Sequence, residues 1–184
     1  SIALRQIYTN SISSQDGVTK DIWGGGFNCI YKSNAVIEGC NSSTMLSQHV
    51  KQQLIGEALF LRAFWQFYLV NEFGDIPIIT STDYKANAII SRSSKDLVYQ
   101  QIVSDLKQAQ MNLDDSYVDG NNNSNSSERV RANNGAATAL LARVYLYTGK
   151  FVEAEEQASL VINNKALYEI INLENVFLKN SRES

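Results

Sequence analysis

Residues 56–79 read GEALFLRAFWQFYLVNEFGDIPII, and this stretch decides the fold. On a helical wheel its apolar side chains cover nearly every direction, and only Arg62 and Gln66, one turn apart, mark a narrow polar stripe. A helix that is apolar on almost all sides is buried, so we predict the central helix of a helical domain. The aromatic side chains, which we expect to pack in its core, are Phe60, Phe64, Trp65, Phe67, Tyr68 and Phe73.

The ends of this helix are marked by residues that start and stop helices. A serine and a threonine at 43–44 give the predicted start, and Phe73 is the predicted last residue. Gly74 suits a left-handed cap, and Pro77 cannot continue a helix. Residues 76–80 are therefore expected to leave the helix as an extended segment.

Arg62 needs a partner inside this apolar helix, because an unpaired buried charge is very costly. Glu57, Asp75 or a backbone carbonyl oxygen are the candidate partners. We interpret Arg62 and Asp75 as structural residues, with Asp75 capping or bridging the end of the helix.

Helical spacing of apolar residues recurs on both sides of the central stretch. Before it, the pattern runs from Trp23 to Ile37. Because glycine is a poor helix former, the first regular turn is predicted after Gly24-Gly25-Gly26, with a loop over 10–21 preceding it. After it, helices are predicted over 93–113, 134–148 and 151–163, and loops over 81–91 and 114–130.

The last two predicted helices are joined only by Gly149-Lys150, which requires an antiparallel hairpin. Residues 147–154 (YTGKFVEA) also resemble the turn of a tetratricopeptide repeat. The sequence therefore predicts an all-α fold of tetratricopeptide-like antiparallel helical repeats with irregular loops. Its length favours a single domain over residues 1–184.

Composition excludes several classes of function. The chain has 184 residues and a formal net charge of -3, and its Lys and Arg residues are scattered. Nucleic-acid binders usually show a basic face, so no nucleic-acid partner is expected. Charged residues interrupt the apolar runs, which argues against a membrane-spanning helix. Cys29 and Cys40 lie on one predicted helix, about three turns apart, which is too far for a disulfide. The two cysteines and the single histidine, His49, do not form a metal-ligand pattern, so no metal site is predicted.

Sequence motifs of serine hydrolases, zinc proteases and phosphate-binding loops are missing, so neither an enzyme activity nor a cofactor is predicted. A carbohydrate site needs aromatic faces for the C–H groups of the sugar and polar side chains for its hydroxyls. Aromatic residues on predicted loops are therefore the ligand-binding candidates. The first is Trp23 beside Lys20 and Asp21, and Tyr84 and Tyr117 follow. For each of them, packing within the protein is the alternative interpretation.

Three stretches together resemble the SusD/RagB-like outer-membrane nutrient-binding lipoproteins of Bacteroidetes. The family signature has the form GEA-x-FLRA, an aromatic-rich stretch and FGD-x-P. Residues 96–109 (DLVYQQIVSDLKQA) resemble the next helix of the family, and 135–158 (GAATALLARVYLYTGKFVEAEEQA) its helical-repeat pair. The signature residues that we interpret as structural are Gly56, Glu57, Arg62, Gly74, Asp75 and Pro77.

The resemblance implies a cell-surface subunit that binds an oligosaccharide or another nutrient without enzyme activity. Such a subunit sits as a lid on a TonB-dependent outer-membrane transporter and hands its cargo to it. The alternative is a helical-repeat scaffold for protein–protein interaction without sugar binding, but such a scaffold has no reason to carry the signature.

Family members are longer than this chain and are anchored through an N-terminal lipidated cysteine. Neither Cys29 nor Cys40 lies in a lipidation motif, and the chain begins at Ser1 without an initiator methionine. We therefore expect the chain to be the N-terminal, helical-repeat part of a longer protein, with its lipid anchor missing.

Overall fold

The computed structural model describes residues 5, 8, 9, 11, 17–122, 126, 128–169, 171, 172 and 174. This part of the chain is helical, which confirms the predicted all-α class, and an isolated β-bridge joins Ile76 and Ser93. The helices are α2 (Gly17–Ser42), α3 (Gln48–Phe73), α4 (Tyr84–Asn87), α5 (Lys95–Asn112), α6 (Asn134–Tyr147) and α7 (Phe151–Asn163).

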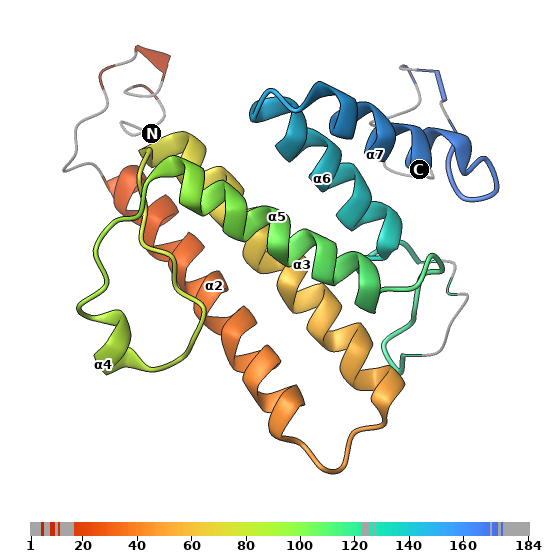
Figure 1. Ribbon diagram of the computed structural model, residues 1–184, viewed down its shortest axis with the longest axis horizontal. Helices are drawn as coiled ribbons and strands as arrows, with labels where there is room; N and C mark the ends of the chain where they lie inside the picture. Colours follow the sequence, from red (N-terminus) through yellow and green to blue (C-terminus); the bar gives the residue numbers. More distant parts are fainter. Residues whose placement is uncertain are drawn as a thin grey trace.

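Helix α3 is the spine of the described structure. It packs against α2 on one side and α5 on the other, while α6 packs against α5 and α7 against α6 (Figure 1). The long helices alternate in direction along the chain, as in a series of helical hairpins (Figure 1). The predicted antiparallel helical repeats are therefore present.

The core forms where α3 meets its neighbours. Ala63, Phe67 and Val70 are fully buried, although the helix also carries polar residues. The core residues that α5 and α6 contribute are Val98, Tyr99, Ile102, Leu106, Leu140, Leu141, Val144 and Tyr145. The aromatic side chains of α3 pack here or lie at its margin, as expected, although Tyr68 is 38% exposed.

Helix α3 begins later than predicted. Its N-cap is Ser47, whose hydroxyl oxygen accepts a hydrogen bond from the Val50 amide at 3.4 Å. Ser43 instead accepts from the amides of Met45 and Leu46, both at 3.3 Å, in a separate turn. The prediction was wrong because several residues of this segment are capable of capping a helix.

The end of α3 lies at Phe73, as predicted. Gly74 has a φ of 70°, which favours glycine, and its amide donates to the Val70 carbonyl oxygen at 3.1 Å. Its ψ of -130° lies outside the left-handed helical region, so the cap is of another type than expected.

Helix α2 corrects the prediction for residues 10–26. It begins at Gly17 and continues without a break through Gly24-Gly25-Gly26, where we expected a loop and then a glycine junction. Gly26 lies so close to α3 that an added Cβ would come within 3.0 Å of Leu69. Burying the apolar face of α2 outweighs the propensity cost of about 1 kcal/mol for each glycine. Residues 10 and 12–16 of the predicted loop lie outside the described residues.

The C-terminal hairpin has the predicted form. Helices α6 and α7 are antiparallel (Figure 1) and are joined by Thr148, Gly149, with a φ of 71°, and Lys150, so α6 ends one residue earlier than predicted. The Lys150 amide closes the turn by donating to the Tyr145 carbonyl oxygen at 2.9 Å.

Cys29 and Cys40 are both free thiols on α2. Among the helices of the described segments, none combines the length and the apolar character that crossing a bilayer requires.

Candidate functional site

Arg62 is the centre of a buried polar network. Its guanidinium group makes two hydrogen bonds of 2.7 Å to the Asp105 carboxylate and one of 2.8 Å to the Asn34 side-chain oxygen. Asp105 is 0% exposed and Arg62 6%, so the ion pair is shielded from solvent. The network joins α2, α3 and α5 at one level of the domain.

The predicted partners of Arg62 were therefore wrong. Asp105 is 43 positions away in the sequence and reaches Arg62 only because α5 packs on α3. Glu57 binds Arg131 instead, through contacts of 2.8 and 3.1 Å. Arg131 also donates to the Asp119 carbonyl oxygen at 2.6 Å, so Glu57 fixes the segment between α5 and α6.

Asp75 has a structural role, but its side chain caps the start of the following helix, α5, and not the end of α3. Its carboxylate accepts a hydrogen bond from the Lys95 amide at 2.9 Å, at the first residue of α5. Arg92 donates to the Asp75 carbonyl oxygen at 2.7 Å, and the Ser93 amide donates to that of Ile76 at 2.9 Å. These contacts close the two ends of a loop that we call the 76–92 loop.

The 76–92 loop lies along α2. The Asn34 side-chain amide donates to the carbonyl oxygens of Ile79 and Ser81, both at 3.2 Å. Further on, the Glu38 carboxylate accepts from the Thr82 hydroxyl and, at 2.9 Å, from the Thr82 amide. These hydrogen bonds, that of the hydroxyl first, lower the pKa of the Glu38 carboxyl group. Residues 79–82 of the loop are therefore held against α2 by hydrogen bonds.

Tyr84 is presented at the outer part of this loop. It is the first residue of α4, and Asp83 caps that short helix by accepting from the Lys85 and Ala86 amides at 2.9 and 3.2 Å. The Tyr84 side chain is 73% exposed, so its ring is accessible to a ligand. Ile89, at 83% exposure, is a second apolar side chain on the same loop, which the sequence analysis did not single out.

Trp23 occupies a different environment from the one predicted. It lies within α2, not on a loop, and its ring is 4.7 Å from that of Phe27 and 5.0 Å from that of Phe73. The Arg92 guanidinium lies 5.1 Å from the Trp23 ring centre. Lys20 and Asp21 are exposed on the preceding turn of α2. The Trp23 ring thus packs against residues of α2, α3 and the 76–92 loop.

Tyr117 lies on the segment between α5 and α6, as predicted. The Arg129 guanidinium is 5.4 Å from its ring centre and 5.9 Å from that of Tyr168. Burial, followed by the interaction with Tyr168, raises the pKa of Tyr117 to about 12. Its ring and hydroxyl therefore already have partners within the protein.

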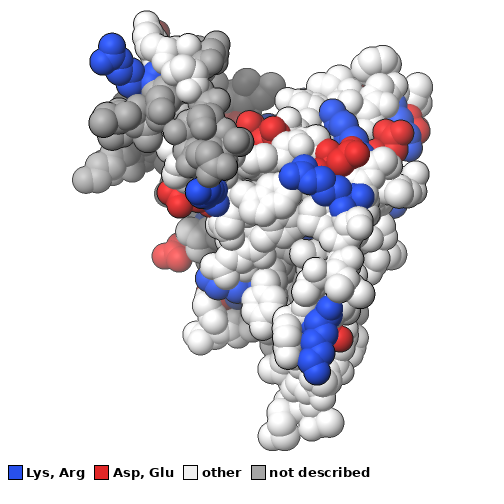
Figure 2. Space-filling model, turned by 90° about the vertical axis from the view of Figure 1, so that its left-hand side faces the viewer, with Lys and Arg blue, Asp and Glu red and all other residues white. Residues whose placement is uncertain are grey.

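The structure does not bring the predicted ligand-binding residues together. Trp23 lies where the 76–92 loop begins and ends, Tyr84 on its outer part, and Tyr117 beyond α5. The side of the molecule on which α4 lies is largely uncharged, with basic and acidic side chains interspersed (Figure 2). In the described part of the chain, no group of three or more His, Cys, Asp or Glu side chains is arranged to hold a metal ion.

Comparison with known proteins identifies the family. Residues 1–146 match the model of a SusD-like family described as "Starch-binding associating with outer membrane". The chain belongs to the SusD-like family. The resemblance inferred from the GEA-x-FLRA and FGD-x-P elements is thereby confirmed. This is a carbohydrate-binding family associated with the outer membrane, and its members are binding proteins.

Individual SusD-like proteins agree with this assignment. SusD-like protein P2 of Formosa agariphila is 30% identical over 169 residues, which are 90% of this chain and 31% of that protein. A SusD-like protein of Bacteroides fragilis has a similar crystal structure, with a TM-score of 0.76 and 30% identity over 92% of this chain and 33% of that one. A laminarin-binding SusD-like protein has a TM-score of 0.73 and 27% identity, over 82% of this chain and 32% of its own. The chain thus spans about a third of the length of these relatives.

Proposed function

We propose that this SusD-like chain belongs to a cell-surface subunit that binds an oligosaccharide and works with a TonB-dependent outer-membrane transporter in its uptake. The observation that carries the proposal is the similarity to the laminarin-binding SusD-like protein over 82% of this chain, at a TM-score of 0.73. In this proposal the subunit is held at the outer membrane by a lipid anchor N-terminal to this chain. Residues 1–184 act as one helical-repeat domain.

Tyr84 is the first aromatic residue of the proposed sugar site. Its exposed ring offers a flat apolar face to the C–H groups of a sugar, and the adjoining Asp83 and Lys85 offer groups for its hydroxyls. The largely uncharged surface on this side suits a neutral glycan (Figure 2). We rank Trp23 and Tyr117 below Tyr84 as proposed sugar contacts, because their rings already pack against other residues. Lys20 and Asp21 stay proposed polar contacts beside Trp23.

The proposed function is binding without hydrolysis. A glycosidase needs two carboxylates facing each other across a bound sugar. Near Tyr84, Asp83 caps α4 and Glu38 binds Thr82, so both carboxylates have structural partners. We therefore expect this surface to bind a glycan and to release it unchanged.

A binding experiment tests the proposal. Isothermal titration of the chain with laminarin oligosaccharides, with malto- and cello-oligosaccharides as further probes, is expected to show binding of at least one glycan. No new reducing ends are expected to form. Tyr84→Ala is expected to weaken that binding at least tenfold, whereas Phe151→Ala, which removes an exposed aromatic ring on α7, leaves it unchanged. Binding that is the same in both variants would remove Tyr84 from the site, and release of reducing ends would contradict the non-enzymatic function.

A protein-interaction scaffold is the second candidate. It is favoured by a separate feature, an amide-lined groove between α2 and α5.

A further inference from the structure

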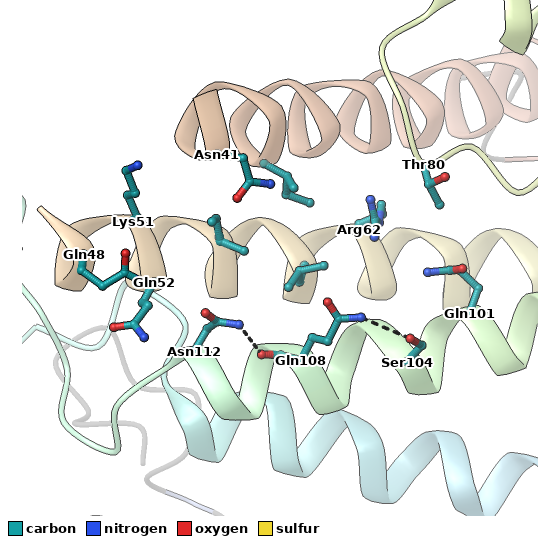
Figure 3. A pocket seen from close by; sticks show the side chains of 13 residues that line it. Asn41, Gln48, Lys51, Gln52, Arg62, Thr80, Gln101, Ser104, Gln108 and Asn112 are labelled. Carbon is teal, nitrogen blue, oxygen red and sulfur yellow. Dashed lines mark hydrogen bonds between the residues drawn. The ribbon is translucent and has the colours of Figure 1, made fainter. Parts of the chain in front are cut away.

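A groove of about 810 Å³ runs along α3 between α2 and α5 (Figure 3). Its floor is one face of α3, where the lining residues recur at intervals of three and four positions. Helix α2 and the start of the 76–92 loop form one wall, and α5 forms the other. The lining residues are Ile37, Asn41, Gln48, Lys51, Gln52, Ile55, Leu59, Arg62, Thr80, Gln101, Ser104, Gln108 and Asn112.

Most of the lining side chains are polar. Carboxamide and hydroxyl groups dominate the lining, and aliphatic side chains from Ile37, Ile55 and Leu59 fill the places between them. The lining contains neither a carboxylate nor an aromatic ring. Without a carboxylate the groove is a poor site for a cation. Without an aromatic ring it offers no surface on which a sugar ring can stack.

The amide groups recur at a spacing that suits an extended polypeptide. Ser104, Gln108 and Asn112 follow one another at intervals of four residues on α5, which is about 6 Å along a helix axis. In an extended chain, backbone groups that point to the same side recur every two residues, or about 6.6 Å. Gln48 and Gln52 repeat the four-residue interval on α3. Successive side chains on the α5 wall and on the α3 floor are thus able to meet successive backbone groups of one strand-like segment.

The groove also has a definite length. Between Gln48 and Arg62 the α3 axis rises by about 21 Å, which corresponds to about six residues of extended chain. Arg62 is the last lining residue of α3, and its guanidinium is already bound to Asp105 and Asn34. Lys51, near the other end, donates to the Ser43 carbonyl oxygen.

Several of the amide groups are available for binding. In the described part of the chain, the side chains of Asn41, Gln48 and Gln52 make no hydrogen bond within the protein. On α5, Gln108 donates to the Ser104 hydroxyl at 3.3 Å and keeps its oxygen as an acceptor (Figure 3). A carboxamide offers both donors and an acceptor, as a peptide group does, so the two pair readily.

We propose that this groove binds an extended, uncharged polypeptide segment of a partner protein, about six residues long, through its backbone amides. Side chains that point toward the floor meet the aliphatic residues, and those that point outward stay in solvent. The groove is distinct from the outer part of the 76–92 loop, so the proposal stands independently of glycan binding at Tyr84.

The test uses a random twelve-residue peptide library displayed on phage, selected against the chain. Enriched peptides are then synthesised, and their affinities are measured by fluorescence anisotropy. We expect binding to the chain and at least tenfold weaker binding to the double variant Gln52→Leu/Gln108→Leu. Methylation of alternate backbone nitrogens of the peptide is expected to weaken binding by at least tenfold as well. Gln100→Leu, an exposed change on α5 outside the groove lining, is expected to leave the affinity unchanged.

Three results would overturn the proposal. The first is a selection that enriches no peptide on a chain whose thermal unfolding shows it to be folded. The second is an affinity that does not change on backbone methylation or in the double variant. The third is binding of laminarin oligosaccharides that is lost in Gln52→Leu/Gln108→Leu, which would assign the groove to glycans.

Discussion

The Asp75 carboxylate accepts a hydrogen bond from the Lys95 amide at 2.9 Å, so the second residue after the end of α3 caps the start of α5. Ser94, the N-cap residue by position, makes no capping hydrogen bond with its own side chain. The FGD element of the family signature therefore stabilises a helix about twenty residues further along the chain. It also closes the 76–92 loop, which lies between the two helices.

Removal of this cap has a predictable cost. Asp75→Ala is expected to lower the free energy of unfolding by about 1 kcal/mol, because the α5 amide loses its acceptor. Asp75→Asn keeps an oxygen at this position and is expected to retain most of the stability. Urea unfolding measures both variants. Asp96→Ala, which removes an exposed carboxylate of the same helical turn, is the control, and a loss equal to that of Asp75→Ala would count against specific capping.

The Arg62–Asp105 pair predicts an asymmetry between single and double substitutions. Arg62→Leu leaves the Asp105 carboxylate buried without its partner and is expected to destabilise the fold by about 3–5 kcal/mol. Arg62→Leu/Asp105→Leu removes both charges and is expected to cost much less, because an apolar pair fills the same space. Chemical denaturation of the three proteins gives the comparison. Unchanged stability in Arg62→Leu would contradict the structural role of the arginine.

Gln66 predicts a stabilising substitution. The side chain is 0% exposed, and among the described residues neither its nitrogen nor its oxygen has a hydrogen-bond partner. An unsatisfied buried polar group costs about 1–3 kcal/mol, so Gln66→Leu is expected to raise the free energy of unfolding by about 1 kcal/mol.

Gln53 provides the matched control. It is also a buried amide on α3, but its nitrogen donates to Glu57 at 2.7 Å and to the Ala132 carbonyl oxygen at 3.4 Å. Gln53→Leu is therefore expected to destabilise the protein. The midpoints of thermal and urea unfolding are expected to rise in Gln66→Leu and to fall in Gln53→Leu. A loss of stability in Gln66→Leu would refute the interpretation.

Two glycines on helices are expected to respond oppositely to alanine. A Cβ at Gly56 would lie 2.7 Å from Leu113 Cγ and 3.1 Å from Asn112 Cβ, so Gly56→Ala pushes α3 away from the end of α5. We expect a loss of about 1–3 kcal/mol despite the better helix propensity of alanine. Gly25→Ala meets no atom within 4 Å and is expected to stabilise α2 by up to about 1 kcal/mol. Equal effects in an unfolding experiment would show that packing at Gly56 is not limiting.

Much of the helical framework was predictable from local patterns. The end of α3 at Phe73 and the α6–α7 hairpin agree with prediction, because cap and link residues mark these boundaries directly. The start of α2 was not predictable in this way. Its glycines disfavour a helix locally, and only the contact of Gly26 with Leu69 shows why the helix continues through them.

The partners in the site were harder to predict, because they come from distant parts of the sequence. One signal for the Arg62 partner was present: Asp105 falls on the apolar face of its helix, between the buried residues Ile102 and Leu106. The position of Trp23 depended on the incorrect loop, so its packing against Phe73 was missed. Tyr84 was predicted on a loop and lies on the short helix α4 within it, where its side chain is exposed, and its role in ligand binding stays a prediction.

The closed ends of the 76–92 loop separate its structural anchor from its exposed outer part. Asp75, Ile76, Arg92 and Ser93 hold the ends together near the helices, whereas none of the residues of α4, on the outer part, is buried. Insertions and substitutions in the outer part therefore change the surface at little cost in folding free energy. Such a loop is an exchangeable module: a protein engineer is able to replace its outer part while keeping the same helices, and in the proposed function this replacement changes the glycan that is bound.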